Sequence, residues 1–475
     1  MHKYNYNIIV IGGGSGGLVS SYIAAAVKAK VALIEKDKMG GDCLNTGCVP
    51  SKALLHSAKI LSYAKRAKEF GFKEIGIEFD FANIMERVQN IVKAIEPHDS
   101  QERYTNLGVD CIKGEARITC PHSIEVNGKT LTARSIIIAT GARPLVPPIS
   151  GLNKIDYLTS DNVWDLKQLP KKLTVLGGGP IGVEMAQAFS RLGAEITLVE
   201  MAQQILIRED TDVIKQITEK FKNEGITVLT NHKAKEFKEN SLICEHDGKD
   251  VSIAFDKVII ALGRKANITG FGLEELGVEI RKTGTIKANP FLQTNIPSIY
   301  VCGDVTGPYQ FTHTAAHQAW YASVNALFSP FKKFRTDYSV IPWANFTDPE
   351  IARVGLNEKD AQAANIPYEI TNYSINDLDR AITDSEAHGF VKILTVPGKD
   401  KILGVTIVSI HAGDLIAEYI LAMKHGIGLN KILSTIHIYP TLTEANKYAA
   451  GEWKKAHIPE FAMKMLEKFH AWRIK

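Results

Sequence analysis

A strand, a glycine-rich loop, a helix, a second strand and a closing acid occur in the same order twice in this chain of 475 residues. The first copy begins with the apolar segment 7–11 and the second with the apolar segment 173–176. In both copies the acid follows the first glycine at the same spacing. The shared positions are three loop glycines and one acid: Gly12, Gly14, Gly17 and Glu35, then Gly177, Gly179, Gly182 and Glu200.

Each residue type in this pattern has a physical reason. The first glycine permits a tight turn, the second lets the backbone approach a pyrophosphate, and the third lets the helix pack closely on the strand. The helix N-terminus offers N–H groups and the positive end of its dipole to phosphates. The acid accepts hydrogen bonds from an adenosine ribose. One such loop is weak evidence, but two complete copies predict two dinucleotide-binding units.

Composition narrows the class of protein. Hydrophobic residues make up 45% and charged residues 23%, as in ordinary globular chains. The 56 Lys and Arg against 52 Asp and Glu leave a net charge of +4, too even for a protein that binds nucleic acid through phosphate neutralisation. Six cysteines are too few for a secreted disulfide scaffold. The uncharged stretch from Tyr4 to Val27 is too glycine-rich for a signal or membrane segment, so we expect a cytoplasmic protein.

Shifts in pattern predict an α/β fold in four parts. These parts are two Rossmann-like dinucleotide-binding domains, a central region and a C-terminal α+β domain. The alternating pattern at 402–408 and the helical stretch 414–424 belong to that last domain. The expected boundaries are 1–150, 151–278, 279–345 and 346–475.

Two cysteines lie five positions apart in the segment 40–52, with glycines on both sides. Pro50 suits the first turn of a helix that we expect to begin around 49–52. A thiolate at Cys48 would lie at that helix N-terminus, which lowers a thiol pKa. Half a zinc site is the weaker interpretation because no second Cys/His pair has matching spacing, and a fixed disulfide does not suit a cytosolic chain. We interpret Cys43 and Cys48 as a redox-active pair.

The segment Gly-Gly-x-Cys-x-Asn-x-Gly-Cys-Val-Pro-Ser-Lys, ending at Lys52, resembles that of the class I pyridine nucleotide–disulfide oxidoreductases. That family includes dihydrolipoamide dehydrogenase, glutathione reductase and mercuric ion reductase. The resemblance extends over nearly the whole chain, through 139–141, 262–264 and 302–304. It implies a homodimeric enzyme with FAD in the first unit and a nicotinamide dinucleotide in the second. It also implies that the central region completes the FAD site and that the C-terminal domain forms the dimer interface.

The resemblance also implies roles for single residues. Electrons would pass from the nicotinamide through the flavin to Cys48, and Cys43 would exchange with the acceptor. Lys52, paired with Glu184, would lie under the flavin and stabilise its negative charge when reduced. Glu35 would hold the FAD ribose and Asp304 the ribityl chain. Further cofactor contacts would come from Gly41, Gly114, Thr140, Gly141, Gly263 and Ala316.

Glu200 indicates which nicotinamide coenzyme, NAD(H) or NADP(H), the second unit binds. A carboxylate there accepts hydrogen bonds from a free ribose 2′-hydroxyl and repels a 2′-phosphate. Arg208 is the nearest arginine after the second strand, whereas NADPH-dependent members tend to carry arginines directly after it. We therefore expect NAD(H) rather than NADP(H).

One segment departs from the family pattern. Most members end in His-Pro-Thr-x-Ser/Thr-Glu, with the histidine as acid–base for the exchanging thiol. Here Tyr439 stands before the proline and Glu444 closes the segment. Tyrosine, with a pKa near 10, is a poor base at neutral pH. His437 lies two residues earlier, where it either substitutes for the missing base or belongs to the core.

The departure keeps three functions open. The first hypothesis, and the function that we predict, is a dihydrolipoamide dehydrogenase-like enzyme that passes electrons between NAD(H) and a thiol/disulfide acceptor; the other two are alternatives. A mercuric-reductase-like enzyme would reduce a metal ion or quinone; it shares tyrosine at 439, but this chain has no cysteine after Cys302. A non-catalytic redox-sensing flavoprotein is the third.

A terminal helix is expected over 459–473, with Phe461, Met465, Phe469 and Trp472 at helical spacing and lysines on the other side. It either packs on the interface domain or contacts a membrane surface or partner protein.

Overall fold

The computed structural model describes residues 3–475; residues 1 and 2, with which the first expected domain begins, lie outside the described part. The chain forms two compact units, and each draws on several stretches of sequence. The nucleotide unit contains the residues up to 62 together with 77–205 and 225–337. The interface unit contains 63–76, 206–224 and 338–475. The expected boundaries between four domains stay a prediction.

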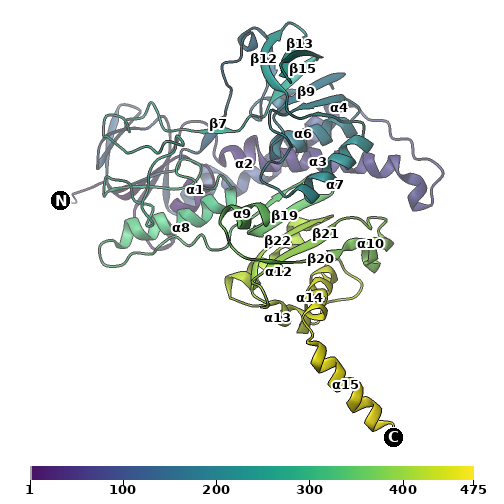
Figure 1. Cartoon of the computed structure of the whole chain (residues 1–475). Helices are drawn as coiled ribbons and strands as arrows, with labels where there is room; N and C mark the ends of the chain where they lie inside the picture. The colour runs from purple at the N-terminus through teal and green to yellow at the C-terminus, as the bar shows by residue number, and fades with distance from the viewer. Residues whose placement is uncertain (1–2) are drawn as a thin grey trace. The chain divides into compact units, whose positions relative to one another are not determined.

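The first sheet of the nucleotide unit carries the first glycine-rich copy. Five strands pair in parallel in the order β3-β2-β1-β6-β17, and β5 and β4 extend the sheet from β6 in antiparallel pairing. Helices α1 (Ser15–Ala26) and α8 (Thr312–Phe328) pack together, as Figure 1 shows. The strands are β1 (Tyr6–Ile11), β2 (Val31–Glu35), β3 (Val109–Lys113), β4 (Arg117–Cys120), β5 (Ser123–Val126), β6 (Lys129–Ile138) and β17 (Ile299–Val301).

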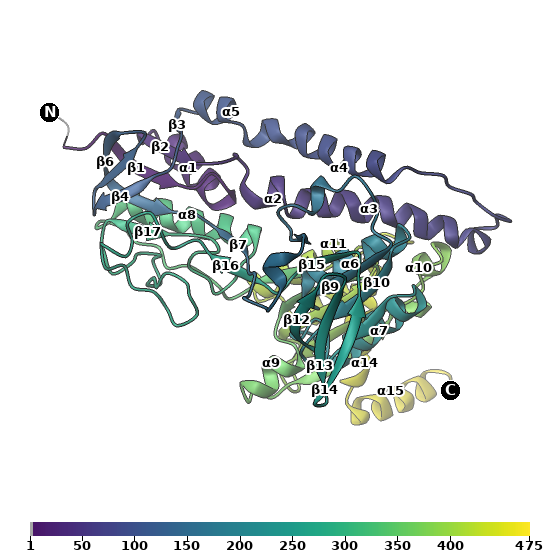
Figure 2. The same cartoon turned by 90° about the horizontal axis from the view of Figure 1, so that it is seen from above.

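The second sheet repeats this arrangement on a smaller scale. Five parallel strands follow the order β11-β10-β9-β15-β8, and α6 (Pro180–Arg191) packs on β9 and β10 (Figure 2). The apolar run of each central strand is buried, as expected for parallel sheets. The strands are β8 (Tyr157–Leu158), β9 (Lys172–Leu176), β10 (Glu195–Val199), β11 (Thr227–Leu229) and β15 (Lys257–Ile260).

Smaller elements complete the nucleotide unit. A three-stranded antiparallel sheet joins β12 (Lys233–Lys238), β13 (Ser241–His246) and β14 (Lys249–Ala254), and a two-stranded one joins β7 (Ala142–Pro144) and β16 (Arg264–Ala266). The helices are α1 (Ser15–Ala26), α2 (Gly41–Asn45), α3 (Cys48–Lys65), α4 (Phe81–Ile95), α5 (Gln101–Asn106) and α8 (Thr312–Phe328). The last residues of α3 belong to the interface unit.

The interface unit is built on an antiparallel sheet in the order β18-β19-β22-β21-β20. Its strands are β18 (Pro342–Asn345), β19 (Glu350–Gly355), β20 (Glu369–Ser374), β21 (Phe390–Thr395) and β22 (Ile402–Ser409). Its helices are α7 (Thr211–Asn223), α9 (Glu358–Ala363), α10 (Asp379–Thr383), α11 (Ala412–Leu415), α12 (Ala417–Lys424), α13 (Leu429–Ser434), α14 (Glu444–Ala456) and α15 (Glu460–Arg473). The α+β character and the strand expected at 402–408 are confirmed.

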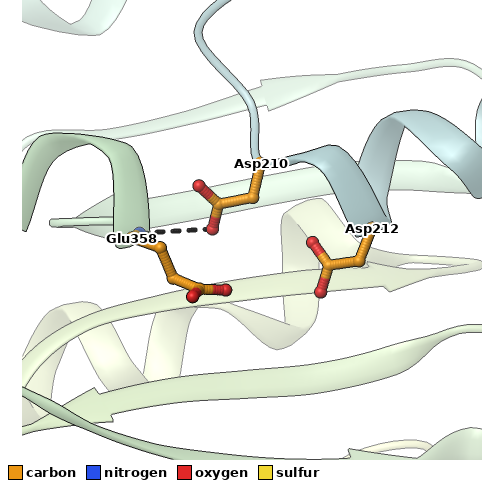
Figure 3. A group of neighbouring side chains, drawn as sticks. All are labelled: Asp210, Asp212 and Glu358. Atoms are coloured by element: carbon orange, nitrogen blue, oxygen red, sulfur yellow. Dashed lines mark hydrogen bonds between the residues drawn. The ribbon is translucent and has the colours of Figure 1, made fainter. Parts of the chain in front are cut away.

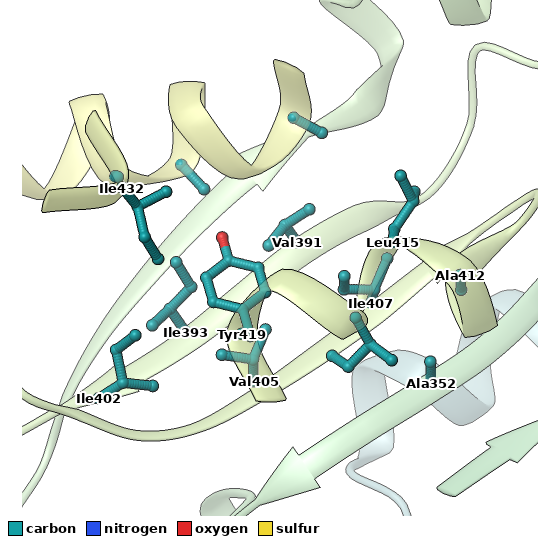
Figure 4. Close-up of a cluster of buried hydrophobic side chains, with 14 of the residues drawn as sticks. Ala352, Val391, Ile393, Ile402, Val405, Ile407, Ala412, Leu415, Tyr419 and Ile432 are labelled. Atoms are coloured by element: carbon teal, nitrogen blue, oxygen red, sulfur yellow. The ribbon is translucent and has the colours of Figure 1, made fainter. Parts of the chain in front are cut away.

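The core of the interface unit surrounds Tyr419, which is fully buried on α12. Val391 and Ile407 approach its ring from β21 and β22, as Figure 4 shows. The tyrosine hydroxyl donates a hydrogen bond to the backbone carbonyl of Asn446 on α14, which satisfies the one polar atom of the ring. The core therefore joins the sheet to the helices that come after it in the chain.

Three carboxylates gather in the interface unit: Asp210 is the N-cap residue of α7, Asp212 lies in the first turn of that helix, and Glu358 begins α9 (Figure 3). Such a group could hold a metal ion, but the Nζ atom of fully buried Lys392 lies 2.8 Å from an oxygen of each. Burial alone would lower the pKa of that ammonium, and its three acidic hydrogen-bond partners raise it above its ordinary value. Lys392 therefore supplies the positive charge that the carboxylates require.

No helix among residues 3–475 is long and apolar enough to cross a membrane.

Candidate active site

The two glycine-rich loops have nearly the same backbone geometry. Gly12 and Gly177 have φ of +104° and +115°, and a Cβ on either would lie 2.4 Å from a backbone oxygen of the neighbouring strand end. A Cβ on Gly17 or Gly182 would lie 1.7 or 1.9 Å from the carbonyl oxygen of the first glycine of its own loop. Only glycine fits these four positions, so the sequence repeat is a structural repeat.

The acids that close the two repeats are held in the same way. Glu35 accepts hydrogen bonds from the backbone N–H groups of Gly13, at 2.5 Å, and Asp37, at 2.7 Å. Glu200 accepts them from Gly178, at 2.7 Å, and Ala202, at 2.8 Å. Each carboxylate therefore lies against its own glycine loop, where a nucleotide ribose is expected.

The helices that come after the loops fit a pyrophosphate. Gly14 and Gly179 are the N-cap residues of α1 and α6; neither helix has a side-chain cap, and neither first turn contains an acid. The N–H groups of both first turns thus face no competing anion from their own helix. This donor set suits the phosphates of FAD at α1 and of a nicotinamide dinucleotide at α6.

The other residues that the resemblance implies as cofactor contacts lie on several elements of the nucleotide unit. A Cβ on Gly41 would lie 2.6 Å from the Cα of Gly14, so the segment with the cysteines runs directly against this loop. Gly114 donates its N–H to the carbonyl of Glu35 at 2.9 Å. Thr140 and Gly141 come directly after β6, where the Thr140 hydroxyl donates to the carbonyl of Asn267 at 2.7 Å. Ala316 lies in the second turn of α8, and Gly263 precedes β16.

Cys43 lies in α2, and Cys48 is the first residue of α3, so the expected helix start is confirmed within one residue. Both are free thiols. The hydrogen bond with Cys48, followed by partial burial, raises the pKa of the Cys43 thiol well above its ordinary range. The hydrogen bond from Cys43 lowers the pKa of Cys48 to about 6 against the opposing effect of burial, with help from Thr312 and Lys52. In the reduced pair the negative charge is therefore favoured on Cys48, and Cys43 holds its proton more firmly.

Lys52 and Glu184 form the ion pair that the family resemblance implies. The Nζ atom of Lys52 lies 2.8 Å from Oε2 of Glu184, although the two are 132 residues apart in sequence. The Glu184 side chain is 7% exposed and that of Lys52 36%. Because Lys52 lies one helical turn after Cys48, its charge lies on the thiolate side of α3. The second glycine-rich helix thus contributes an acid beside the thiols.

Two contacts at this site were missed from the sequence. The Thr312 hydroxyl lies 3.5 Å from Sγ of Cys48, at the first residue of α8. The Arg264 guanidinium contacts the carboxylate of Asp42, next to Cys43, and lies 3.4 Å from Oδ2 of Asp304. Burial raises the pKa of Asp304, and Arg264 opposes that rise. Arg264 thereby links the redox segment to the acid expected at the FAD ribityl chain. The available signal was an arginine a few residues after the buried strand β15, at the start of β16.

The segment that departs from the family pattern lies in the interface unit. Nε2 of His437 lies 3.1 Å from Oε1 of Glu418, and its Nδ1 lies 3.2 Å from the carbonyl oxygen of Thr435. The imidazole side chain is 7% exposed, so His437 is held within its own unit. Tyr439 is exposed and donates its hydroxyl to Asp379 at 2.9 Å, which raises the tyrosine pKa.

Glu444 is buried at the start of α14 and accepts hydrogen bonds from the Thr441 N–H at 3.2 Å and the Tyr448 hydroxyl at 3.1 Å. It therefore orders the turn that carries Tyr439. Tyr439 and Glu444 both line a surface hollow of about 390 Å³, together with Tyr373 and Asp377. This hollow is rich in tyrosine hydroxyls and carboxylates.

Comparison with known proteins places the chain in a family. The model described as "Pyridine nucleotide-disulphide oxidoreductase" matches residues 6–319, and its dimerisation domain matches 341–450. A mercuric reductase of Lysinibacillus sphaericus is 35% identical, over 96% of this chain and 84% of that protein. A dihydrolipoyl dehydrogenase of Chlamydia pneumoniae is also 35% identical, over 92% of this chain and 95% of that protein.

Solved structures agree with this placement. The HOCl-induced flavoprotein disulfide reductase RclA of Escherichia coli, as a C43S mutant in complex with Cu(II), is similar with a TM-score of 0.84 and 25% identity. The match covers 94% of this chain and 99% of that one. The resemblance inferred from the motifs is confirmed, as is the expected mixed α/β fold with a dimerisation domain. The chain belongs to the class I pyridine nucleotide–disulfide oxidoreductases, enzymes that depend on FAD and NAD(P) and assemble as homodimers.

Proposed function

We propose that this enzyme uses NADH to reduce a thiophilic metal ion through the Cys43–Cys48 pair. FAD, when bound, would relay an electron pair from the nicotinamide to the cysteines. One NADH supplies the electrons that take one Hg²⁺ to Hg⁰ or a pair of Cu²⁺ ions to Cu⁺, and it leaves NAD⁺ and a proton. Family membership makes the chain an enzyme, which sets the non-catalytic alternative aside.

The observation that carries the proposal is the state of the segment 437–444. Exchange of Cys43 with a disulfide or dithiol needs a group that takes up and returns a proton near neutral pH. His437 has both ring nitrogens bonded within its own unit, and the pKa of Tyr439 is raised further from neutrality by Asp379. A soft metal cation needs no such base, because coordination itself displaces the proton of a thiol.

The thiol pair suits such an acceptor. The negative charge of the reduced pair is favoured on Cys48, whereas Cys43 holds its proton more firmly until an electrophile or cation arrives. Thiolates select soft ions such as Hg²⁺ and Cu⁺ over hard ones. A mercuric reductase and a Cu(II) complex of RclA are among the similar proteins, which supports metal ions as the class of acceptor to test first.

NADH is the proposed donor because of Glu200. Its carboxylate is fixed against the second glycine loop by two backbone N–H groups, where it would accept from a ribose 2′-hydroxyl and repel a 2′-phosphate. We also propose a reducing compartment such as the cytoplasm, in line with six unpaired cysteines. The terminal helix lies beyond both family matches, so we assign it to a contact with a membrane surface or a partner protein.

A thiol/disulfide acceptor is the second candidate. The dihydrolipoyl dehydrogenase of Chlamydia pneumoniae matches this chain about as well as the mercuric reductase does, and Glu444 still orders the turn before α14. A quinone acceptor belongs in the same substrate panel.

Restoring the missing base tests the proposal. FAD-loaded wild type should oxidise NADH with Hg²⁺ or Cu²⁺ and turn over lipoamide at least about tenfold more slowly. Tyr439→His should raise lipoamide turnover and leave metal reduction nearly unchanged, with Tyr439→Phe as the matched control. Wild-type turnover of lipoamide at the rate of the best metal ion would refute the assignment of the acceptor.

A further inference from the structure

The terminal helix α15 (Glu460–Arg473) has no buried residue, and it extends away from the sheet of its unit (Figure 1). Pro459 precedes it as the N-cap residue. Its large apolar side chains are all exposed, with Phe461 at 67% and Trp472 at 70%. The others are Met463, Met465, Leu466 and Phe469. A helix this apolar and this exposed has its contact surface outside its own unit.

The side chains of α15 are sorted by type around its axis. At about 3.6 residues per turn, Phe461, Met465, Phe469 and Trp472 share one side of the helix. Lys464 and Lys468 lie along one edge of this apolar stripe and not on the opposite side of the helix, as the sequence had led us to expect; Arg473 lies near the other edge. The cations Lys464, Lys468, Arg473 and Lys475 outnumber the acids Glu460 and Glu467 in the segment 460–475.

The helix lies outside the fold that the family shares. The dimerisation model ends at residue 450, ten residues before α15 begins at 460. RclA is matched over 99% of its own chain while covering 94% of this one. The family's dimerisation model is therefore matched without any residue of α15. Contact of α15 with α15 of a second copy would bring the cations at the edges of the two apolar stripes together. Because like charges repel, a symmetric contact of this kind is disfavoured.

We propose that α15 docks the enzyme on an anionic lipid surface, lying in the plane of the interface with its aromatic stripe among the acyl chains. Trp and Phe are favoured at that depth, and lysines reach the headgroups by extending their aliphatic stems along the stripe edge. Anionic headgroups supply the charge that complements Lys464, Lys468, Arg473 and Lys475. The homodimer carries two such helices, so the two contacts reinforce each other.

Vesicle flotation of the full-length, FAD-loaded dimer tests this. We expect the protein to float with vesicles of phosphatidylcholine and phosphatidylglycerol, and to stay behind with phosphatidylcholine alone or at high salt. Lys464→Glu with Lys468→Glu should weaken binding roughly tenfold or more, since each basic residue near the surface contributes about a fivefold gain. The same charge change at exposed Lys399 and Lys401 serves as the control.

A second pair of variants tests the apolar stripe. Phe469→Ser with Trp472→Ser should abolish flotation, whereas Met463→Ser, on the other side of the helix, should leave it nearly unchanged. NADH-driven reduction in solution should be the same in all variants, which separates this proposal from that of the acceptor. Three results would overturn the lipid assignment: no flotation, equal binding to neutral vesicles, or a dimer that becomes a monomer when residues 460–475 are removed. The last result would identify α15 as a contact between subunits.

Discussion

The two glycine-rich repeats of the nucleotide unit share a backbone and differ in the segments attached to it. Their first glycines have nearly the same φ, and both closing acids are held by two backbone N–H groups. After the first acid the chain enters α2 and α3 with Cys43 and Cys48, whereas the second repeat contributes only Glu184 to that site. Two loops of similar backbone geometry can thus serve two dinucleotides. The redox-active thiols come from the helices that follow the first loop.

The largest expected effects come from the third glycine of each repeat. Gly17→Ala and Gly182→Ala each place a Cβ within 2 Å of a carbonyl oxygen, so each should lower the free energy of unfolding by about 2–3 kcal/mol. Gly17→Ala should also purify without flavin. Gly182→Ala should stay yellow and be reduced by dithionite but not by NADH. Gly76→Ala, whose Cβ meets nothing within 4 Å, is the control. Equal flavin loss in both variants would contradict the assignment of the two loops.

The closing acids should separate the repeats by coenzyme. Glu200→Ala should reduce the preference for NADH over NADPH, as a ratio of kcat/KM, by about tenfold or more, because a charged hydrogen bond to the ribose is lost and a repulsion is relieved. Glu35→Ala should leave the preference unchanged and weaken flavin retention. A wild-type preference for NADPH would show that Glu200 does not select the coenzyme.

Only the first repeat leads into a thiol pair, and the effect of Cys43 on the pKa of Cys48 can be measured. The hydrogen bond from Cys43 is the main cause of the low pKa of Cys48, so Cys43→Ala should raise that pKa by roughly one unit or more from about 6. Thiolate absorbance near 240 nm would then appear at higher pH than in reduced wild type. An unchanged midpoint would assign the low pKa to the N-terminus of α3 instead.

The smallest effects should come from the ion pair between the repeats. Lys52 lowers the pKa of Cys48, and Glu184 raises it. Lys52→Met should therefore move the thiolate midpoint to higher pH, and Glu184→Gln should move it to lower pH, each by roughly one unit or less. Shifts in the same direction would mean that the two residues act on the thiols through structure rather than charge.

Much of the candidate site could be predicted because it is encoded locally. The glycine spacing implied the loops, and the position of Pro50 implied a helix start close to Cys48. The Lys52–Glu184 pair came from the family resemblance alone, since the two residues are 132 positions apart and no periodicity joins them. The site roles stay predictions, but the structure brings these residues together as expected.

The missed contacts are those that only tertiary packing creates. Thr312 and Arg264 reach the redox segment from 264 and 222 positions away. His437 lies in the segment between α13 and α14, and its acceptor Glu418 lies on α12, so the sequence alone could not distinguish a held imidazole from a free base. Lys392 lies in an alternating strand pattern, and its three acidic partners come from distant segments.

The interface unit is assembled from three separated stretches, and this has a consequence for how the protein is made on the ribosome. Arg66 and α7 are synthesised long before the buried Glu386 and Lys392 that pair with them. Until residue 392 has emerged, the apolar side chains of α7 and the carboxylates of Asp210 and Asp212 lack their native surroundings. A nascent chain stopped near residue 345 would therefore expose the apolar side chains of α7 and be prone to aggregate. We expect this unit to fold only after translation has finished.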